Sequence, residues 1–260
     1  LIDKRIKTSI VRIIVTKTFF NEDATIDGGK INFSFGSGFI NNHFIISCSH
    51  LLSIKDSFVE DINLYRKINR KEPTIEELKS FIAENIKKIE FQRYGETAFF
   101  EAKLKKFDVE YDCSSFEFAD LKNKINGLRI NSDKELKEGE EVVFAGFPTV
   151  VPQYKIIETP FTVNEGIISS FPEITVGGLK KYKFIQVNAV NLGGNSGAPL
   201  FLKKSGEVIG IIAGNQNMGF DIFQMKDDKL DKKIEGQKAW VMAFGVAYAT
   251  PIRFATQLIK

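Results

Sequence analysis

Apolar and polar residues alternate in short runs along most of the chain, which is the pattern of β-strands. Residues 9–16, for example, form a β-branched run between two polar segments. Similar runs follow, with turn residues between them. They lie at residues 31–49 (two strands around Asn41 and Asn42), 89–92 with 98–105 as a hairpin, 112–118, 140–146, 162–169, 184–190, 199–202, 208–213 and 240–248. Many short strands of this kind predict a closed or sandwiched β architecture.

A helical period replaces this alternation over residues 53–89. Thr74 and Glu77 have the spacing of a capping box, and apolar residues then recur every three or four positions. These residues are Ile75, Leu78, Phe81, Ile82 and Ile86. A shorter helix is expected over 57–68, and Pro251 is expected to open a C-terminal helix over 251–260. The first stretch is therefore a helical insertion, either a packed surface decoration or a docking or gating element.

Composition narrows the class of protein without naming a function. A β-barrel protein of 260 residues is commonly one compact unit, and 43% hydrophobic residues can form a sizeable core. The net charge of +3, with both signs interleaved, argues against a nucleic-acid binder. No apolar run is long enough to span a membrane, and the first residues do not resemble a signal peptide, so localisation stays open. Abundant Lys, Ile, Asn and Phe are typical of an AT-rich, bacterial genome.

The chain has two cysteines, Cys48 and Cys113, which is fewer than a secreted disulfide scaffold usually carries. They are either free thiols that pack in the core or the two halves of one bridge. A functional alternative is redox control of the protein through these two cysteines.

The stretch 193–200 carries the first candidate chemistry, because it sets Ser196 between glycines. Glycines allow a tight turn that exposes the hydroxyl and brings backbone N–H groups close to a ligand. Two such groups can form an oxyanion hole for acyl transfer. The competing interpretation is an ordinary hairpin turn.

A serine hydroxyl needs a base, and the chain has only two histidines. His43 follows two asparagines and is expected in a solvated turn, whereas His50 ends an apolar strand and is the better general base. A carboxylate must orient that base. The candidates are Asp108, Asp112, Asp120 and Asp133.

Taken together, the order His, Asp, Ser resembles the chymotrypsin-fold serine proteases, and more narrowly the trypsin-like peptidase domain of HtrA type. Matching segments occur in order through nearly the whole chain except 53–87 and about 215–237. They are 36–39 (Gly-Ser-Gly-Phe), 46–50 (Ile-Ser-Cys-Ser-His), 107–112 (Phe-Asp-Val-Glu-Tyr-Asp), 137–148, 186–200 and 244–252. No PDZ-like segment is expected after the protease domain.

The resemblance implies a mainly β fold of two six-stranded antiparallel barrels in a single protease domain, 1–260. The N-terminal barrel would cover about 8–120 and contain the insertion 53–89. The C-terminal barrel would cover about 135–250, and a terminal helix would follow at 251–260.

The resemblance also implies roles for individual residues. Ser196 would be the nucleophile, His50 the base and Asp112, favoured over Asp120, its orienting acid. Gly194, Asn195 and Ser196 would form the oxyanion hole. The substrate-binding pocket would lie near Val190, Ile212, Ala213 and Gly214, with no acidic residue, so an apolar P1 side chain of modest size is expected unless Asp221 points inward.

Three positions depart from the family pattern. Ala198 stands where a second glycine is usual, and Cys113-Ser114 is more polar than the usual continuation after the aspartate. Asn195 stands where secreted zymogens have an aspartate that pairs with a freshly cut N-terminus. The resemblance therefore implies an enzyme that N-terminal cleavage does not activate.

The function that follows is a serine endopeptidase acting on protein or peptide substrates, with no cofactor and no metal. A regulatory protein partner could act through the insertion 53–89 or the loop 215–237, and neither nucleic acid nor a membrane is expected as a partner. The alternative is a catalytically silent binding module on the protease fold. A serine esterase or transferase is a third possibility.

Overall fold

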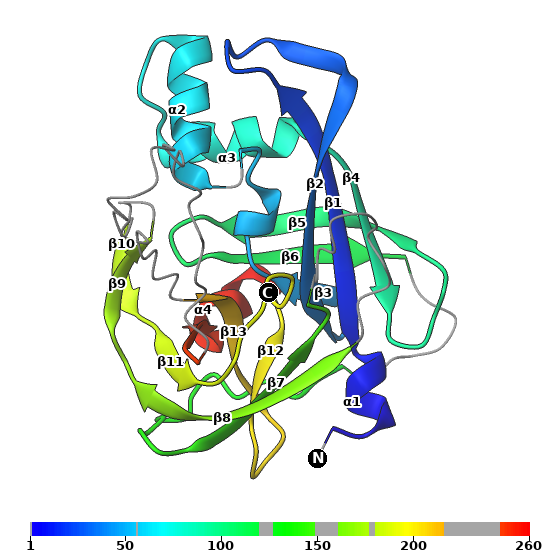
Figure 1. Cartoon of the computed structure of the whole chain (residues 1–260), viewed down its shortest axis with the longest axis vertical. Coiled ribbons are helices and arrows are strands. Elements are labelled where there is room, and N and C mark those ends of the chain that lie inside the picture. The colour runs from blue at the N-terminus through cyan, green and yellow to red at the C-terminus, as the bar shows by residue number, and fades with distance from the viewer. Residues whose placement is uncertain (1, 56, 120–126, 149–160, 177–179, 216–244) are drawn as a thin grey trace, which may run out of the picture.

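Two closed β-barrels lie side by side and make up most of the molecule (Figure 1). The computed structural model describes residues 2–55, 57–119, 127–148, 161–176, 180–215 and 245–260. All neighbouring strands in both barrels are antiparallel. The predicted fold, mainly β with two six-stranded antiparallel barrels, is confirmed.

The first barrel has the strand order β1-β2-β3-β6-β5-β4. Its strands are β1 Ile10–Phe20, β2 Ile26–Asn41, β3 Phe44–Ser47, β4 Ile86–Arg93, β5 Phe100–Asp108 and β6 Cys113–Phe118. The second barrel has the order β11-β14-β13-β12-β7-β8. Its strands are β7 Glu141–Gly146, β8 Thr162–Ser170, β11 Ile185–Asn188, β12 Pro199–Leu202, β13 Val208–Asn215 and β14 Ala247–Pro251. A separate two-stranded sheet pairs β9 Glu173–Val176 with β10 Lys180–Lys183, which the sequence analysis did not predict.

Alternate residues of the strands fill the barrels. Val11, Ile13 and Val15 of β1 point into the first core, as the period of two predicts. A further apolar cluster joins the two barrels, in which residues such as Phe39 of β2 and Phe201 of β12 are buried together. Full burial of one such side chain contributes about 1.5–3 kcal/mol, so this shared cluster fixes one barrel against the other.

Two helices lie at one end of the first barrel, in the predicted insertion (Figure 1). They are α2 Phe58–Asn69 and α3 Ile75–Glu84, so both predicted helices are present. The predicted helical period extended to Ile86, which is wrong, because Ile86 begins β4. The capping box is also confirmed, because Glu77 N donates to Thr74 Oγ1 at 3.2 Å and Thr74 N to Glu77 Oε2 at 2.9 Å. Tyr65 and Phe81 pack edge to face between the helices.

The chain ends are also helical. Pro251 ends β14 and precedes α4 Ile252–Ala255, which continues as a 3₁₀ turn, Thr256–Leu258. At the other end, Asp3 caps α1 Lys4–Thr8, an element too short for its periodicity to be seen in the sequence. The predicted strand at 240–248 is only partly testable, because residues 240–244 lie outside the described residues; its described part begins at Ala247. Among the described residues, no helix is long and apolar enough to cross a membrane.

Candidate active site

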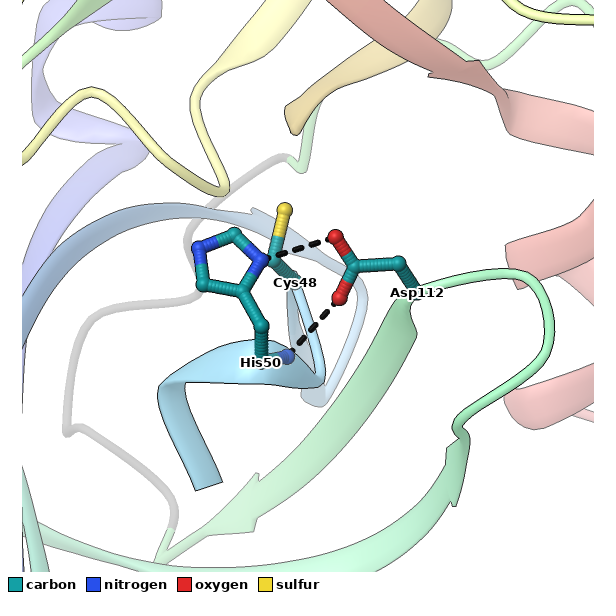
Figure 2. Close-up of side chains that lie close together, drawn as sticks. All are labelled: Cys48, His50 and Asp112. Carbon is teal, nitrogen blue, oxygen red and sulfur yellow. Dashed lines mark hydrogen bonds and ion pairs between the residues drawn. The ribbon is translucent and has the colours of Figure 1, made fainter. Parts of the chain in front are cut away.

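His50 and Asp112 contact each other directly, as Figure 2 shows. His50 begins a 3₁₀ turn, His50–Leu52, shortly after β3 ends. Its Nδ1 lies 2.7 Å from Asp112 Oδ2, and its main-chain N–H donates to Asp112 Oδ1 at 2.8 Å. Ser49 Oγ adds a third bond to the same carboxylate at 3.2 Å. Because one carboxylate binds both the ring and the backbone, the orientation of the imidazole is fixed.

Asp112 reaches this position through an unusual backbone conformation between β5 and β6. Its φ is +49°, in the left-handed region that costs an L-residue about 1–2 kcal/mol. Asp108 builds the turn, because its Oδ1 accepts the N–H groups of Glu110 and Tyr111 at 2.8 and 3.0 Å. Asp133 is exposed, and Asp120 lies outside the described residues. Of the described candidates, Asp112 is therefore the aspartate that contacts His50.

The charges of the pair favour an ionised carboxylate. Burial raises the pKa of Asp112, but the charge of His50 and the hydrogen bonds from His50 and Ser49 outweigh burial and keep the pKa below its usual value. For His50, burial lowers the pKa, while the Asp112 charge and hydrogen bond raise it, and the net direction is upward. The imidazole side chain retains 30% exposure, so it can meet a substrate.

Ser196 lies in the loop between β11 and β12, which hydrogen bonds tie to both barrels. Ser37 N of β2 donates to Ser196 O at 2.7 Å, and Gly197 N donates to Ile212 O at 2.7 Å. Gly197 has φ +91°, and a Cβ there would clash with Ser37 O and Ser47 Oγ. The glycine after the serine is thus required by both its conformation and the closeness of β2.

Ser37 is a site residue to which the sequence analysis gave no role. Its hydroxyl donates to Gly194 O at 2.8 Å and accepts Phe147 N at 2.9 Å, so it links β2, the serine loop and the end of β7. A Cβ at Gly36 would lie 2.9 Å from Ser196 O and would clash with Leu51. The available signal was the Gly-Ser-Gly spacing, which lets β2 approach both segments closely.

Some main-chain N–H groups of the Ser196 loop have a hydrogen-bond acceptor and others do not. Asn195 N donates to Leu192 O at 3.2 Å, and Ala198 N to Asn195 O at 2.8 Å. Within the described residues, the N–H groups of Gly194 and Ser196 have no acceptor, and Gly194 has φ +88°. The N–H groups of Gly194 and Ser196 can therefore donate to a ligand, and together they give a site where a developing negative charge can be stabilised.

Two polar features of this loop are not paired within the described part of the chain. Ser196 is half-buried, and no hydrogen bond there joins it to His50. The Asn195 side chain is fully buried, and neither its Oδ1 nor its Nδ2 has a partner. A buried amide without hydrogen-bond partners costs about 1–3 kcal/mol.

Cys48 and Cys113 are free, buried thiols, which confirms the core-packing alternative and excludes a bridge between them. Cys48 Sγ donates to Ile212 O at 3.0 Å and lies behind the His50–Asp112 pair (Figure 2). Burial raises the pKa of both thiols well above the usual value, and the Asp112 charge adds to this effect at Cys48.

The donor atoms of Cys48, His50 and Asp112 lie within 4.8 Å of one another, a spacing that metal ligands can have. The chemistry fits a metal poorly, because a metal binds the thiolate and this thiol is strongly held in its protonated form. The 2.7 Å contact between His50 and Asp112 is a charge-assisted hydrogen bond. The cluster is better suited to orienting a base.

The predicted substrate-binding residues differ in how exposed their side chains are. Val190 is 44% exposed, whereas the Ile212 side chain is fully buried in the core of the second barrel. The Ile212 backbone meets the serine loop twice, because its carbonyl accepts Gly197 N at 2.7 Å and its N–H donates to Ala198 O at 2.8 Å. The pocket wall at 212–214 stays a prediction. Ala213 is half-buried, and Gly214 O accepts Asn191 Nδ2 at 3.1 Å. Asp221 lies outside the described residues.

Comparisons with known proteins agree with this architecture. The family model of the trypsin-like peptidase domain matches residues 36–211, more than half of the chain. No curated protein sequence matches. Among solved structures, an HtrA-type protease (AlgW, with tripeptide) has a TM-score of 0.61 and 17% identity over 97% of this chain and 59% of its own. The chain thus spans 59% of the length of that protease.

Two further structures show the same fold. The Rv3671c protease from M. tuberculosis, in its active form, has a TM-score of 0.58 and 15% identity over 98% of this chain and 81% of its own. Deg5 has a TM-score of 0.57 and 16% identity over 98% and 88%. The family match over residues 36–211 shows that the chain belongs to the trypsin-like peptidase domain family, and the two six-stranded barrels have the chymotrypsin-type fold.

Proposed function

We propose that this protein is a serine endopeptidase that cleaves protein or peptide substrates through Ser196, His50 and Asp112. The observation that carries the proposal is the double contact of the Asp112 carboxylate with the ring and the backbone of His50. A histidine oriented in this way, together with a serine loop that has two free N–H donors, has the parts that acyl transfer needs.

In the proposed reaction, Ser196 Oγ attacks the carbonyl carbon of the scissile bond while His50 Nε2 takes the hydroxyl proton. The imidazolium then gives this proton to the leaving amine, and a water that His50 activates hydrolyses the acyl-enzyme. Asp112 keeps a proton on Nδ1, which leaves Nε2 free to act as the base. The N–H groups of Gly194 and Ser196, on either side of Asn195, donate to the oxyanion.

The missing bond between Ser196 and His50 is compatible with this reaction. Catalytic hydrogen bonds are often long in a free enzyme and tighten when substrate binds.

For the substrate, we assign the side chain before the scissile bond to the surface near Val190 and the backbone of Ala213 and Gly214. These positions carry no charge, so an apolar P1 side chain of modest size is favoured. A P1 profile dominated by Lys or Arg would contradict this assignment.

Control by a protein partner is part of the proposal. Asn195 cannot form the ion pair with a cut N-terminus that activates secreted zymogens, so N-terminal cleavage is not the proposed form of control. The insertion 53–89, which directly follows His50, and the loop 215–237 are the proposed docking elements; residues 216–237 lie outside the described residues.

The second candidate function, a catalytically silent binding module, is favoured only by the unpaired Ser196.

A fluorophosphonate probe tests the proposal, because it reacts covalently with an activated serine. We expect labelling of the wild type and of Ser80→Ala, which removes an exposed serine on α3. We expect no labelling of Ser196→Ala or His50→Ala. Labelling that persists in Ser196→Ala would exclude this nucleophile, and no labelling of a folded wild type, with or without peptide substrate, would favour the binding module.

A further inference from the structure

Lys17 of β1 is fully buried inside the first barrel, which is rare for a lysine. A buried ammonium must be given hydrogen-bond acceptors, because the barrel interior does not solvate it. Its Nζ donates to Ser34 Oγ at 2.5 Å and to the main-chain carbonyl of Ser53. Ser53 is also fully buried and lies three residues after His50. The lysine therefore binds the backbone of the segment that carries the catalytic histidine.

Asp61 is a second fully buried charge, and it lies in the first turn of α2. Its Oδ1 accepts Ile54 N at 3.0 Å and Lys55 N at 2.9 Å, and its Oδ2 lies 3.2 Å from Ile54 N. Both donors belong to the segment between the 3₁₀ turn and α2. The helical insertion thus binds this segment by one carboxylate.

Consecutive hydrogen bonds connect the Lys17 and Asp61 contacts to the backbone of His50. Ser53 N donates to His50 O at 3.1 Å, Ser53 O accepts Lys17 Nζ, and the next two N–H groups bind Asp61. Leu51 and Leu52 between them are buried in the first core. The backbone after His50 is therefore fixed by one cation from the barrel and one anion from the insertion.

Charge connects the same groups. Burial raises the pKa of Asp61 to about 6, while the hydrogen bonds from Lys55 and Ile54 and the charge of Lys17 act against this rise. The Lys17 charge also lowers the pKa of His50, in opposition to Asp112. Besides these groups, the Cys48 thiol lies beside His50, and the Lys55 ammonium is turned away to Phe20 O.

We propose that Lys17 and Asp61 are positioning residues for His50, and that through Asp61 the helical insertion sets the geometry of the catalytic base. The proposal rests on the proposed role of His50 as that base. It gives the insertion a physical route to the reaction, because a displacement of α2 moves the backbone that follows the histidine.

Histidine NMR tests the electrostatic part without any catalytic assay. The chain has two histidines, so a His43→Gln background leaves His50 as the only imidazole signal. We expect Lys17→Met to raise the pKa of His50, because a nearby cation is removed. We expect Asp61→Asn to lower it, because the Lys17 charge loses its compensating anion. The double variant should lie between the two.

Kinetics test the positioning part. Asp61→Asn keeps the shape of the side chain but cannot accept the same backbone bonds with both atoms, so we expect kcat to fall about tenfold to a hundredfold with KM nearly unchanged. Asp61→Glu should recover part of kcat. The matched control is Glu60→Gln, which removes an exposed carboxylate from the same turn of α2 and should change neither kcat nor the His50 titration.

The outcomes separate this proposal from the function it rests on. If the wild type does not react with a fluorophosphonate, the proposed enzyme fails, yet the His50 titration still reports whether Lys17 and Asp61 act on this residue. If folded Lys17→Met and Asp61→Asn proteins titrate His50 as the wild type does, and kcat is unchanged, the positioning role is overturned. Shifts in the same direction in both variants would also contradict it.

Discussion

The main-chain N–H of Ser37 donates to the carbonyl oxygen of Ser196 at 2.7 Å, so a strand of the first barrel holds the serine loop of the second. The Ser37 hydroxyl repeats the link at Gly194. These bonds require β2 to lie directly against the loop. Glycine at positions 36 and 197 is what makes that approach possible.

The first prediction concerns Gly197. We expect Gly197→Ala to destabilise the fold by more than about 1 kcal/mol, because its φ is positive and the new methyl group would clash with Ser37. Proteolytic turnover should fall with it, since the loop must move away from β2. Thermal unfolding and peptide hydrolysis measure both effects. Gly193→Ala is the control, because a Cβ at that position meets nothing within 4 Å; equal losses in the two variants would contradict the role of the Ser37 contact.

The second prediction concerns the pH profile. His50 must be neutral to act as a base, and Asp112 holds its pKa above the ordinary value, so activity should rise with pH through a midpoint above that of a free histidine. Asp112→Asn should move this midpoint to lower pH and reduce kcat by about four orders of magnitude. The profile of kcat/KM against pH measures the shift. A midpoint that does not move in this variant would show that Asp112 does not act on His50.

The third prediction concerns stability and Asp61. Its pKa is raised to about 6 in the folded protein, so the folded state binds this proton more tightly than the unfolded state does. Because of Asp61, the free energy of unfolding should fall as the pH rises from about 4 to about 6, by up to about 3 kcal/mol. Asp61→Asn should remove this part of the pH dependence. Urea unfolding at several pH values, with Glu60→Gln as control, tests it, and an unchanged pH dependence in Asp61→Asn would refute it.

The fourth prediction concerns the thiols. Both cysteines are buried and their pKa values are raised, so neither is reactive in the native state. A disulfide reagent should titrate no thiol in the native protein and two in denaturant. Mild oxidants and reductants should leave activity unchanged. Rapid native modification of Cys48, with loss of activity that Cys48→Ser abolishes, would instead support redox control.

Local sequence patterns were sufficient for most of the fold. Alternation identified the main strands, and the capping box at Thr74 and Glu77 located α3. Three elements were not predicted: α1, which is a five-residue helix, and β9 and β10, which form a short separate sheet. None of them leaves a periodic signal of sufficient length.

The candidate site was less accessible from sequence. The sequence order and the strand end indicated Ser196 and His50, and the approach motif favoured Asp112. The left-handed turn at Asp112 and the contact between Ser37 and Gly194, 157 residues apart, depend on tertiary packing. The same limit applies to Lys17, which is fully buried although a local pattern treats it as a polar interruption.

The proposed residues are divided between barrels that are made at different times. His50 and Asp112 belong to the first barrel and Ser196 to the second, and apolar residues of both halves form the cluster that joins them. Because a ribosome synthesises the first barrel well before the serine loop, a nascent chain carries a base and its orienting acid but no nucleophile. Under the proposed function, this chain cannot cleave peptide bonds through Ser196 until the second barrel has been made and has folded against the first.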